Sequence, residues 1–376
     1  MPEFTRTLFV CLLLALPAGL AAPRRSVPLV HTTDLYHPPM DPDDYVDLAT
    51  VFGLPELDLR AVILDADARM VEGTFSPGDA PREPGFVPVM QLAYLTGRSV
   101  AAAIGPLARL RSPQDAALDR PRREQAGIEL LLRTLRQSPE PVVVTVLGSA
   151  RIVTAAFNRD PELLRRKVKS VVVNAGSSAG KANEYNVVID VNAYVGLFRS
   201  GLPIDWYPCV GESTDWNSPE AGAEHNAFWK APQRELFRDL PVPLMAWFVH
   251  GMTGNLRGDL LRALQEEGRG AAAAAVRADT RYLWSTASLV LAAGRTLAKT
   301  PAGWRFVPAG EVPAGAETQT LALDPVSVTI ADDGSTRWQP APPGSRVRLF
   351  RRVPGPVHTA AMTEALNALL RAIPAD

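Results

Sequence analysis

The sequence has little cysteine, and this shortage excludes a disulfide-stabilised fold. Two cysteines, Cys11 and Cys209, occur among 376 residues. Cys11 lies in an N-terminal segment that we expect to be removed, so no intramolecular disulfide can form in the mature chain. Cys209 follows an apolar segment, and a lone thiol in that setting is more often a buried apolar filler than a nucleophile.

The sequence also lacks an excess of charge and a second long apolar run. Its 39 Lys and Arg residues nearly balance 40 Asp and Glu residues. The basic residues are scattered instead of forming a stripe, which argues against nucleic acid as a partner. No apolar stretch beyond the N-terminus is long enough to span a membrane, so we expect a soluble mature protein without a membrane partner.

The one long apolar run is at the N-terminus. Within residues 1–22, Arg6 precedes an apolar run from Leu8 to Leu16, and small residues end the segment at Ala22. The run is too short to cross a bilayer, and Pro17 ends it. The pattern predicts a signal peptide and therefore a secreted or periplasmic protein.

Short β-branched runs alternate with segments that have apolar residues at helical spacing. The predicted strands are 28–33, 59–65, 99–105, 141–148, 168–176 and 202–209, and the helical segments include 45–52, 125–135 and 192–198. This alternation predicts an α/β fold with a mainly parallel, Rossmann-like sheet covered by helices on both faces. Ligands bind such sheets at the carboxyl ends of the strands, so the loops that follow the strands are the expected site.

The C-terminal part has a different pattern. Residues 304–353 are rich in Pro and Gly and contain short alternating runs with an Asp-Gly turn signal, which predicts a small antiparallel β appendage. A final amphipathic helix is expected over Thr359 to Ile373. We therefore divide the chain into a signal peptide (1–22), an α/β domain (23–300) and a C-terminal appendage whose final helix packs on the same domain (301–376).

An acidic loop follows the first predicted strand and contains Asp34, Asp41, Asp43, Asp44 and Asp47. Three of these have a purely structural explanation, because Asp41 as N-cap, Pro42 at N1 and acids in the first turn form a strong helix start. Asp34 has no such explanation. Gathered carboxylates repel one another and stay ionised only if a cation shares the site, and calcium is the natural candidate.

Four segments, in their order and spacing, resemble the nucleoside hydrolases, the inosine-uridine preferring N-ribohydrolase family. Asp43 and Asp44, followed by YVDLA, resemble the closing pair of the family's Asp-x-Asp-x-x-x-Asp-Asp motif. The other three segments are similar to its third strand region, its Gly-Pro-Leu-Thr-Asn turn with the following helix, and its Ala-Glu-Phe-Asn segment; they are 95–110, 141–157 and 182–206. The resemblance implies the family's fold and hydrolysis of an N-glycosidic bond.

The resemblance implies metal and catalytic roles for the acidic loop. In the family, carboxylates and a backbone carbonyl hold calcium, and a metal-bound water attacks the anomeric carbon of ribose with an Asp as general base. Carried over, Asp34 would be the early metal ligand or the base, Asp43 would act in catalysis and contact the sugar, and Asp44 would bind metal. The loop contains the extra residues YHPPM, so Asp41 is a second candidate for the early metal role. Arg151 stands where the carbonyl ligand is expected.

The later motif would supply the sugar-binding residues. Glu184 and Asn186 occupy the positions of the family's Glu and Asn, which hold the sugar hydroxyls. Their alternative interpretation is a solvated loop pair before a helix or strand. The expected chemistry is coherent, because nearby carboxylates stabilise an oxocarbenium-like state and a metal supplies a nucleophile at neutral pH.

The sequence departs from the family at three places. The Arg151 side chain could project from the site, or its guanidinium could take the cation's place and pair with the aspartates. The family's late His-Asp pair is replaced by Trp284 and Ser285, of which Trp284 could stack on a planar base. His250 or Asp215 could substitute for the missing pair from another loop. His37, within the insertion, could be a ligand or acid, although a loop histidine beside two prolines is more often exposed.

These observations predict an exported enzyme that uses its Asp cluster to hydrolyse an N-glycosidic bond of a nucleoside or related ribosyl compound. The alternative is a sugar- or nucleoside-binding protein without turnover, because the late His-Asp pair is lost. A generic α/β domain whose aspartates only cap a helix is the third hypothesis. The expected partner is a small nucleoside or sugar, with a homo-oligomer as a candidate state.

Overall fold

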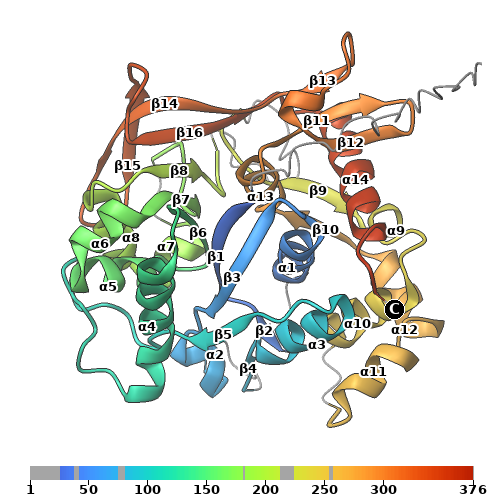
Figure 1. Cartoon of the computed structure of the whole chain (residues 1–376), viewed down its shortest axis with the longest axis horizontal. Coiled ribbons are helices and arrows are strands. Elements are labelled where there is room, and N and C mark those ends of the chain that lie inside the picture. Colours follow the sequence, from blue (N-terminus) through green and yellow to red (C-terminus); the bar gives the residue numbers. More distant parts are fainter. Residues whose placement is uncertain are drawn as a thin grey trace, which may run out of the picture.

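The computed structural model describes residues 26–37, 42–74, 81–180, 183–211, 224–253 and 257–375. Its centre is a nine-stranded sheet in the order β15-β14-β16-β8-β7-β6-β1-β3-β5 (Figure 1). These strands are β1 (Val27–Thr33), β3 (Leu57–Leu64), β5 (Ala101–Ile104), β6 (Val142–Leu147), β7 (Val168–Asn174), β8 (Ile204–Tyr207), β14 (Leu321–Ile330), β15 (Thr336–Pro340) and β16 (Val347–Arg352). All six strands predicted from the sequence are present. No helix within the described ranges has both the length and the apolar character needed to cross a membrane.

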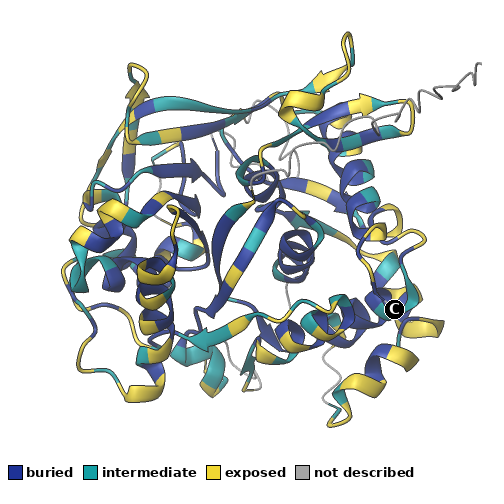
Figure 2. Cartoon of the chain, viewed as in Figure 1, coloured by how far each residue is buried: buried dark blue, intermediate teal, exposed yellow. Residues whose placement is uncertain are grey.

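Helices cover both faces of the central parallel strands, and strands such as β1, β6 and β7 are accordingly almost continuously buried (Figures 1 and 2). The strands β14 and β15 at one edge are partly exposed. Along β6, Val143 and Leu147 join one hydrophobic cluster while Val144 and Val146 join the other, because successive side chains point to opposite faces. The first cluster contains α1 (Asp43–Gly53), α3 (Phe86–Thr96), α10 (Val242–Met252), α13 (Thr286–Ala292) and α14 (Pro356–Arg371). The second contains α4 (Arg122–Gln137), α5 (Arg151–Arg159), α6 (Pro161–Lys167) and α8 (Val191–Arg199).

The strand order reverses between β1 and β6, which is where open α/β sheets bind their ligands. The chain runs outward from β1 through β3 to β5, then returns to the other side of β1 and continues through β6, β7 and β8, all in parallel. Such a reversal of strand order opens a crevice at the carboxyl ends of the two central strands. Asp34 follows β1 and Gly148 follows β6, so both lie at this crevice.

The predicted fold class, a mainly parallel sheet with a small antiparallel part at the C-terminus, is confirmed. The sequence did not indicate how the two parts join. β16 pairs in parallel with β8, so β14, β15 and β16 extend the main sheet. A separate antiparallel sheet is formed by β11 (Arg295–Thr300), β12 (Gly303–Pro308) and β13 (Thr318–Gln319). α14 starts three residues before the predicted helix and packs on the main domain, among the core residues of its first cluster.

Helices α1 and α10 approach closely where Gly251 faces the ring of Tyr45, and a Cβ atom at Gly251 would overlap that ring. We expect Gly251→Ala to lower the free energy of unfolding by about 1–3 kcal/mol, because both elements are buried and overpacking forces side chains off their rotamers. Denaturant unfolding measures the change. Gly310→Ala is the matched control, since nothing lies within 4 Å of a Cβ there. Equal effects of the two substitutions would contradict this account.

Candidate functional site

The acidic loop lies at the crevice. Asp34 directly follows β1, and a Cβ atom on Gly148 would be 2.8 Å from the Cβ of Asp34, so glycine is what lets the two loops approach. Asp43 is buried and Asp44 is half-buried at the start of α1. The helix begins at Asp43 with Pro42 at the N-cap position, one residue later than the sequence predicted. Asp41, the other predicted metal ligand, lies outside the described residues.

Asp43 is tied to the predicted base-binding residue Trp284. The Trp284 backbone N–H donates to both carboxylate oxygens of Asp43, at 3.1 and 3.2 Å. The Trp284 carbonyl accepts a hydrogen bond from Asn174 Nδ2 at 3.1 Å, and the Asn174 carbonyl accepts one from Asn186 Nδ2 at 2.9 Å. The structure therefore links three predicted site residues, Asp43, Asn186 and Trp284, through Asn174.

Asn174 is a site residue that the sequence analysis missed. It ends β7 and is 1% exposed, and its Oδ1 has no hydrogen-bond partner among the described residues. A buried amide oxygen without a partner costs free energy unless a ligand or water satisfies it. The sequence pattern that could have indicated Asn174 as a site residue is a polar residue at the end of an apolar strand, in VVVNAG.

Glu184 is buried and serves as the N-cap of helix α7 (Tyr185–Val188). Its Oε2 accepts from the backbone N–H of Gly176 at 2.7 Å and of Val187 at 3.3 Å, and its Oε1 accepts from Asn186 N–H at 3.0 Å. These contacts agree with the alternative interpretation of Glu184 as a residue at a helix start. That interpretation also expected a solvated side chain, whereas Glu184 is buried. Its role toward a sugar stays a prediction.

Burial raises the pKa of the Glu184 carboxyl to about 7, above its usual 4.5. Between these values the folded protein holds more proton than the unfolded chain, so the Glu184 contribution to stability falls as pH rises from about 4.5 to 7 and is constant above that. We expect Glu184→Gln to lose this part of the pH dependence in urea unfolding curves. Glu162→Gln, at an exposed position, is the control and should keep the wild-type profile. Parallel profiles for wild type and Glu184→Gln would refute the assignment.

Two tyrosines and a further aspartate share the surroundings of the acidic loop. Burial and the nearby charges of Asp34, Asp67 and Asp44 raise the pKa of the Tyr185 hydroxyl. Tyr36, in β2 (Tyr36–His37), accepts a hydrogen bond from the Asp67 backbone N–H, and its pKa is raised by burial. Asp67 precedes helix α2 (Ala68–Glu72), and its Oδ1 accepts from the Arg69 backbone and side chain at 2.9 and 3.1 Å.

Arg151 does not neutralise the acidic loop through any contact seen in the described residues. Its guanidinium is fully buried and pairs with Asp190 at 3.0 Å, while Asp65 and Asp67 are each 3.9 Å away. The side chain therefore pairs with aspartates, as one of the two predicted alternatives required. These aspartates are not Asp34 and Asp44 but Asp190, with Asp65 and Asp67 farther away.

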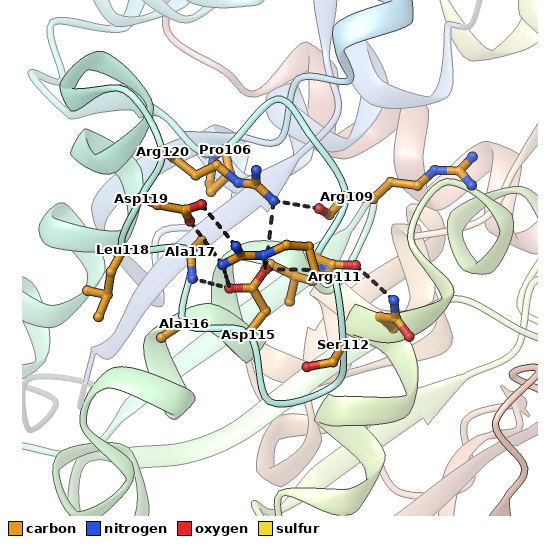
Figure 3. A network of polar contacts seen from close by, with 12 residues as sticks. Pro106, Arg109, Arg111, Ser112, Asp115, Ala116, Ala117, Leu118, Asp119 and Arg120 are labelled. Carbon is orange, nitrogen blue, oxygen red and sulfur yellow. Dashed lines mark hydrogen bonds and ion pairs between the residues drawn. The ribbon is translucent and has the colours of Figure 1, made fainter.

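Arg151 also holds the backbone of two neighbouring loops. Its Nη1 donates to the carbonyls of Ala66, Pro106 and Leu107 at 3.1, 2.7 and 3.0 Å. Pro106 and Leu107 begin the loop between β5 and α4, which has its own ion pairs; Arg111 contacts Asp115 at 2.8 Å and Asp119 at 3.0 Å (Figure 3). Arg151 therefore joins the loop that contains Ala66 to the loop that contains Pro106 and Leu107.

The described residues do not form a complete calcium site. No group of three or more His, Cys, Asp or Glu side chains in the described ranges is arranged to hold a metal ion. One expected carboxylate ligand is also missing, because the buried residue Ser285 stands where the family has the Asp of its late His-Asp pair. Calcium has oxygen ligands in large number, so Asp34 and Asp44 alone would not suffice.

The histidines singled out in the sequence lie in a buried cluster. His37 was expected to be exposed, and this is wrong: it is 3% exposed, its Nδ1 is 3.2 Å from the Tyr45 hydroxyl, and its ring lies 4.7 Å from that of His250. Burial lowers the pKa of both imidazoles, that of His37 to about 4. The Nδ1 atom of His250 lies 3.4 Å from Oε2 of Glu267. Asp215 lies outside the described residues.

Trp284 belongs to a small aromatic cluster beside Asp43. Its ring centroid is 6.2 Å from that of Phe228 and 6.1 Å from that of Tyr282. Its indole N–H donates to the carbonyl of Cys209 at 3.2 Å. Cys209 itself is buried, and burial raises the pKa of its thiol well above the usual value, which is consistent with an apolar filler. The planar ring of the cluster is half-buried and belongs to the residue whose backbone is bonded to Asp43.

No protein-family profile matches the sequence. Similarity to curated proteins covers part of the chain. Over 182 residues, this chain is 28% identical to the pyrimidine-specific ribonucleoside hydrolase RihA of Citrobacter koseri. The matched residues make up 43% of this chain and 55% of that protein. RihA of Salmonella arizonae is 26% identical over the same shares. The chain thus spans about half the length of the curated relatives it matches.

Similarity to solved structures extends over nearly the whole chain and concerns the fold. The purine-preferring ribonucleoside hydrolase from Gardnerella vaginalis has a TM-score of 0.55 at 15% identity and covers 92% of this chain and 99% of its own. The type III effector protein XopQ, complexed with adenosine diphosphate ribose, has a TM-score of 0.51 at 16% identity, with shares of 94% and 95%.

Proposed function

From its place as a divergent member of the nucleoside hydrolase family, we propose that this chain hydrolyses the N-glycosidic bond of a nucleoside or related ribosyl compound. The observation that carries the proposal is that Asp43, at the start of α1, is joined through Trp284 to Asn174, whose Oδ1 has no hydrogen-bond partner among the described residues. Asp34 and Asp44 lie near enough for their charges to raise the pKa of the Tyr185 hydroxyl. The curated relatives and several structural neighbours are ribonucleoside hydrolases, which supports the same reaction.

The carboxylates supply the chemistry of this reaction. Breaking the bond between the anomeric carbon and the base nitrogen leaves positive charge on the ribose ring, and fixed carboxylates stabilise that charge. We assign Asp34 as the base that takes a proton from the attacking water, whose oxygen bonds to the anomeric carbon, and Asp43 as the residue that contacts the sugar. The base nitrogen leaves with the electron pair of the broken bond and takes up a proton from solvent. Asn174 and Asn186 supply amide groups for sugar hydroxyls, and the ring of Trp284 stacks on the leaving base.

The proposal also includes two expectations, that the enzyme binds calcium and that it is exported. The carboxylates within the described residues do not form a complete metal site. Export follows from the N-terminal apolar segment alone, which lies outside the described residues. The test of the metal is hydrolysis measured after EDTA treatment and again with added calcium, together with the calcium content of the purified protein.

The test of the function is base release from a panel of cytidine, uridine, inosine, guanosine and adenosine diphosphate ribose. The panel spans both base classes because the relatives named above include pyrimidine-specific and purine-preferring enzymes. We expect hydrolysis of at least one nucleoside. Tight binding without release of the base would favour the alternative of a non-catalytic binding protein, and absence of both would refute the proposed site.

A further inference from the structure

A departing base must take up a proton unless it already carries a positive charge. When the bond between C1′ and the base nitrogen of a neutral nucleoside breaks, the electron pair of that bond stays on the nitrogen. An acid that protonates this nitrogen in the transition state typically contributes about 10²–10⁴-fold to the rate. The acids near Asp34 and Asp43 therefore limit which nucleosides this chain hydrolyses efficiently.

No histidine of this chain is placed as a charged acid beside Asp43. All five histidines lie within the described residues: His31, His37, His225, His250 and His358. Burial lowers the pKa of four of them, so these four imidazoles are neutral at pH 7. The fifth, His225, contacts the Phe350 carbonyl in β16 and the Trp338 ring in β15, and both strands lie beyond β8 in the sheet. A departing base at Asp43 thus receives no proton from an imidazolium.

The other proton-bearing groups of the site are engaged elsewhere or are weak acids. Both carboxyl oxygens of Glu184 accept hydrogen bonds from backbone N–H groups, three in all. Burial raises the pKa of the Tyr36 and Tyr185 hydroxyls, so each gives up its proton less readily than an ordinary tyrosine. The indole N–H of Trp284 is not acidic and donates to a backbone carbonyl. Within the described part of the chain, the site therefore has a proposed base, Asp34, but no acid directed at a leaving group.

The surroundings of Trp284 are negatively charged. Burial and the charges of nearby carboxylates, Asp34 among them, raise the pKa of both the Tyr185 hydroxyl and the Cys209 thiol. The Cys209 carbonyl accepts the indole N–H of Trp284 at 3.2 Å. Arg69 opposes the effect at Tyr185, but its contribution is smaller than that of each of the three carboxylates that act there. A ligand beside Trp284 is therefore favoured if it is cationic.

The ring of Trp284 can itself hold a cation, because the face of an indole attracts positive charge more strongly than that of any other side chain. Its backbone N–H is bonded to Asp43, and the rings of Phe228 and Tyr282 are tilted from it by 47° and 51° at more than 6 Å. Neither ring is therefore stacked face to face on the indole. Lys230 lies 5.9 Å from the Tyr282 ring but is exposed, so solvent screens its charge.

Asn174 supplies an independent sign of a ligand beside Trp284. Its Nδ2 donates to the Trp284 carbonyl, and its Oδ1, on the same planar amide, has no hydrogen-bond partner among the described residues. The residue is 1% exposed, so bulk water does not reach this oxygen. A buried amide oxygen is stabilised when a ligand donates to it, and a ribose hydroxyl is such a donor.

We infer, on the basis of the proposed function, that this site prefers ribosyl compounds whose aromatic base is already cationic. Two sources share this chemistry, the N-ribosyl pyridinium compounds and the N7-alkylated purine nucleosides. The charged base stacks on Trp284 close to the carboxylates, and Asn174 accepts a hydrogen bond from the sugar.

The reaction then needs no acid. The water oxygen bonds to C1′ and its proton goes to Asp34, which later releases it to solvent. The bond between C1′ and the base nitrogen breaks, and its electron pair cancels the positive charge of the base. The base leaves as a neutral molecule, and the products are ribose, the neutral base and one proton.

The test is a comparison of kcat/KM for matched substrates, with the spontaneous hydrolysis of each compound subtracted. 7-Methylguanosine and guanosine differ by one methyl group and one charge, and nicotinamide riboside and uridine represent a cationic and a neutral single-ring base. We expect kcat/KM for the cationic member of each pair to be higher by at least about a hundredfold, the smaller end of what a missing acid costs. Preference in one pair alone would identify which of the two sources the site takes.

Trp284→Leu separates recognition of the charge from the chemical lability of cationic nucleosides. We expect it to lower kcat/KM about tenfold more for the cationic substrates than for the neutral ones. Trp304→Leu is the matched control and should keep the wild-type ratio, because Trp304 has Lys299 over its ring but belongs to the separate sheet of β11, β12 and β13. If Trp284→Leu fails to fold by circular dichroism, Trp284→Phe takes its place and should lower the ratio less.

Neutral nucleosides hydrolysed as efficiently as their cationic counterparts would overturn the inference while leaving the proposed function intact. A cationic preference that is unchanged in the Trp284 variants would also overturn it, since lability alone would then explain the preference. Absence of turnover with every compound would refute the inference and the proposed function together, so the two failures are distinguishable.

Discussion

Asp34→Asn is expected to lower kcat for nucleoside hydrolysis by about 10²–10⁴-fold, the usual loss when a general base is removed. Asparagine has the same shape but cannot take a proton from water. Asp34 is half-buried at the end of β1 and lies against Gly148, so the isosteric change should leave the fold intact. The measurement is initial rate against substrate concentration for the best nucleoside of the panel, with thermal unfolding of each variant.

The control is Asp332→Asn, at a side chain that is 91% exposed and distant in the fold from the crevice. It should keep wild-type kcat. Asp43→Asn is the companion variant, and since Asp43 is assigned to the sugar, KM should rise in addition to any loss of kcat. An Asp34→Asn enzyme that retains full kcat would show that another group acts as the base.

Arg151→Met is expected to lower the free energy of unfolding by about 3–5 kcal/mol, the cost of removing one partner from a buried ion pair. Methionine fills much of the volume but leaves the Asp190 carboxylate without its 3.0 Å partner. It also removes the donor shared by the carbonyls of Ala66, Pro106 and Leu107. Chemical denaturation near pH 7 gives the change.

Arg165→Met is the matched control, because Arg165 pairs with Glu162 at 2.9 Å but both side chains are solvent-accessible. Exposed pairs contribute about 0–1 kcal/mol. Arg151→Lys should fall between wild type and Arg151→Met, since an ammonium keeps the charge but cannot reach several acceptors with a planar fork. Similar losses for Arg151→Met and Arg165→Met would mean that the buried network adds little.

The strands and their order along the chain were predictable because apolar periodicity is a local property. The run PVVVTVLG predicts burial on both faces, and its residues Val142–Leu147 form β6, in which every residue is buried. The same holds for the helix after the acidic loop, whose first-turn aspartates favour a helix start independently of the site.

The sequence by itself thus determined the α/β class and the position of the acidic loop at the carboxyl end of the first strand, along with its likeness to the nucleoside hydrolases. The tertiary structure decided which polar groups meet. It paired Arg151 with Asp190, 39 positions away, buried His37 against His250, and linked Asp43 to Asn174 through Trp284. Such contacts depend on how distant segments pack, and no local pattern encodes the partner of a buried charge.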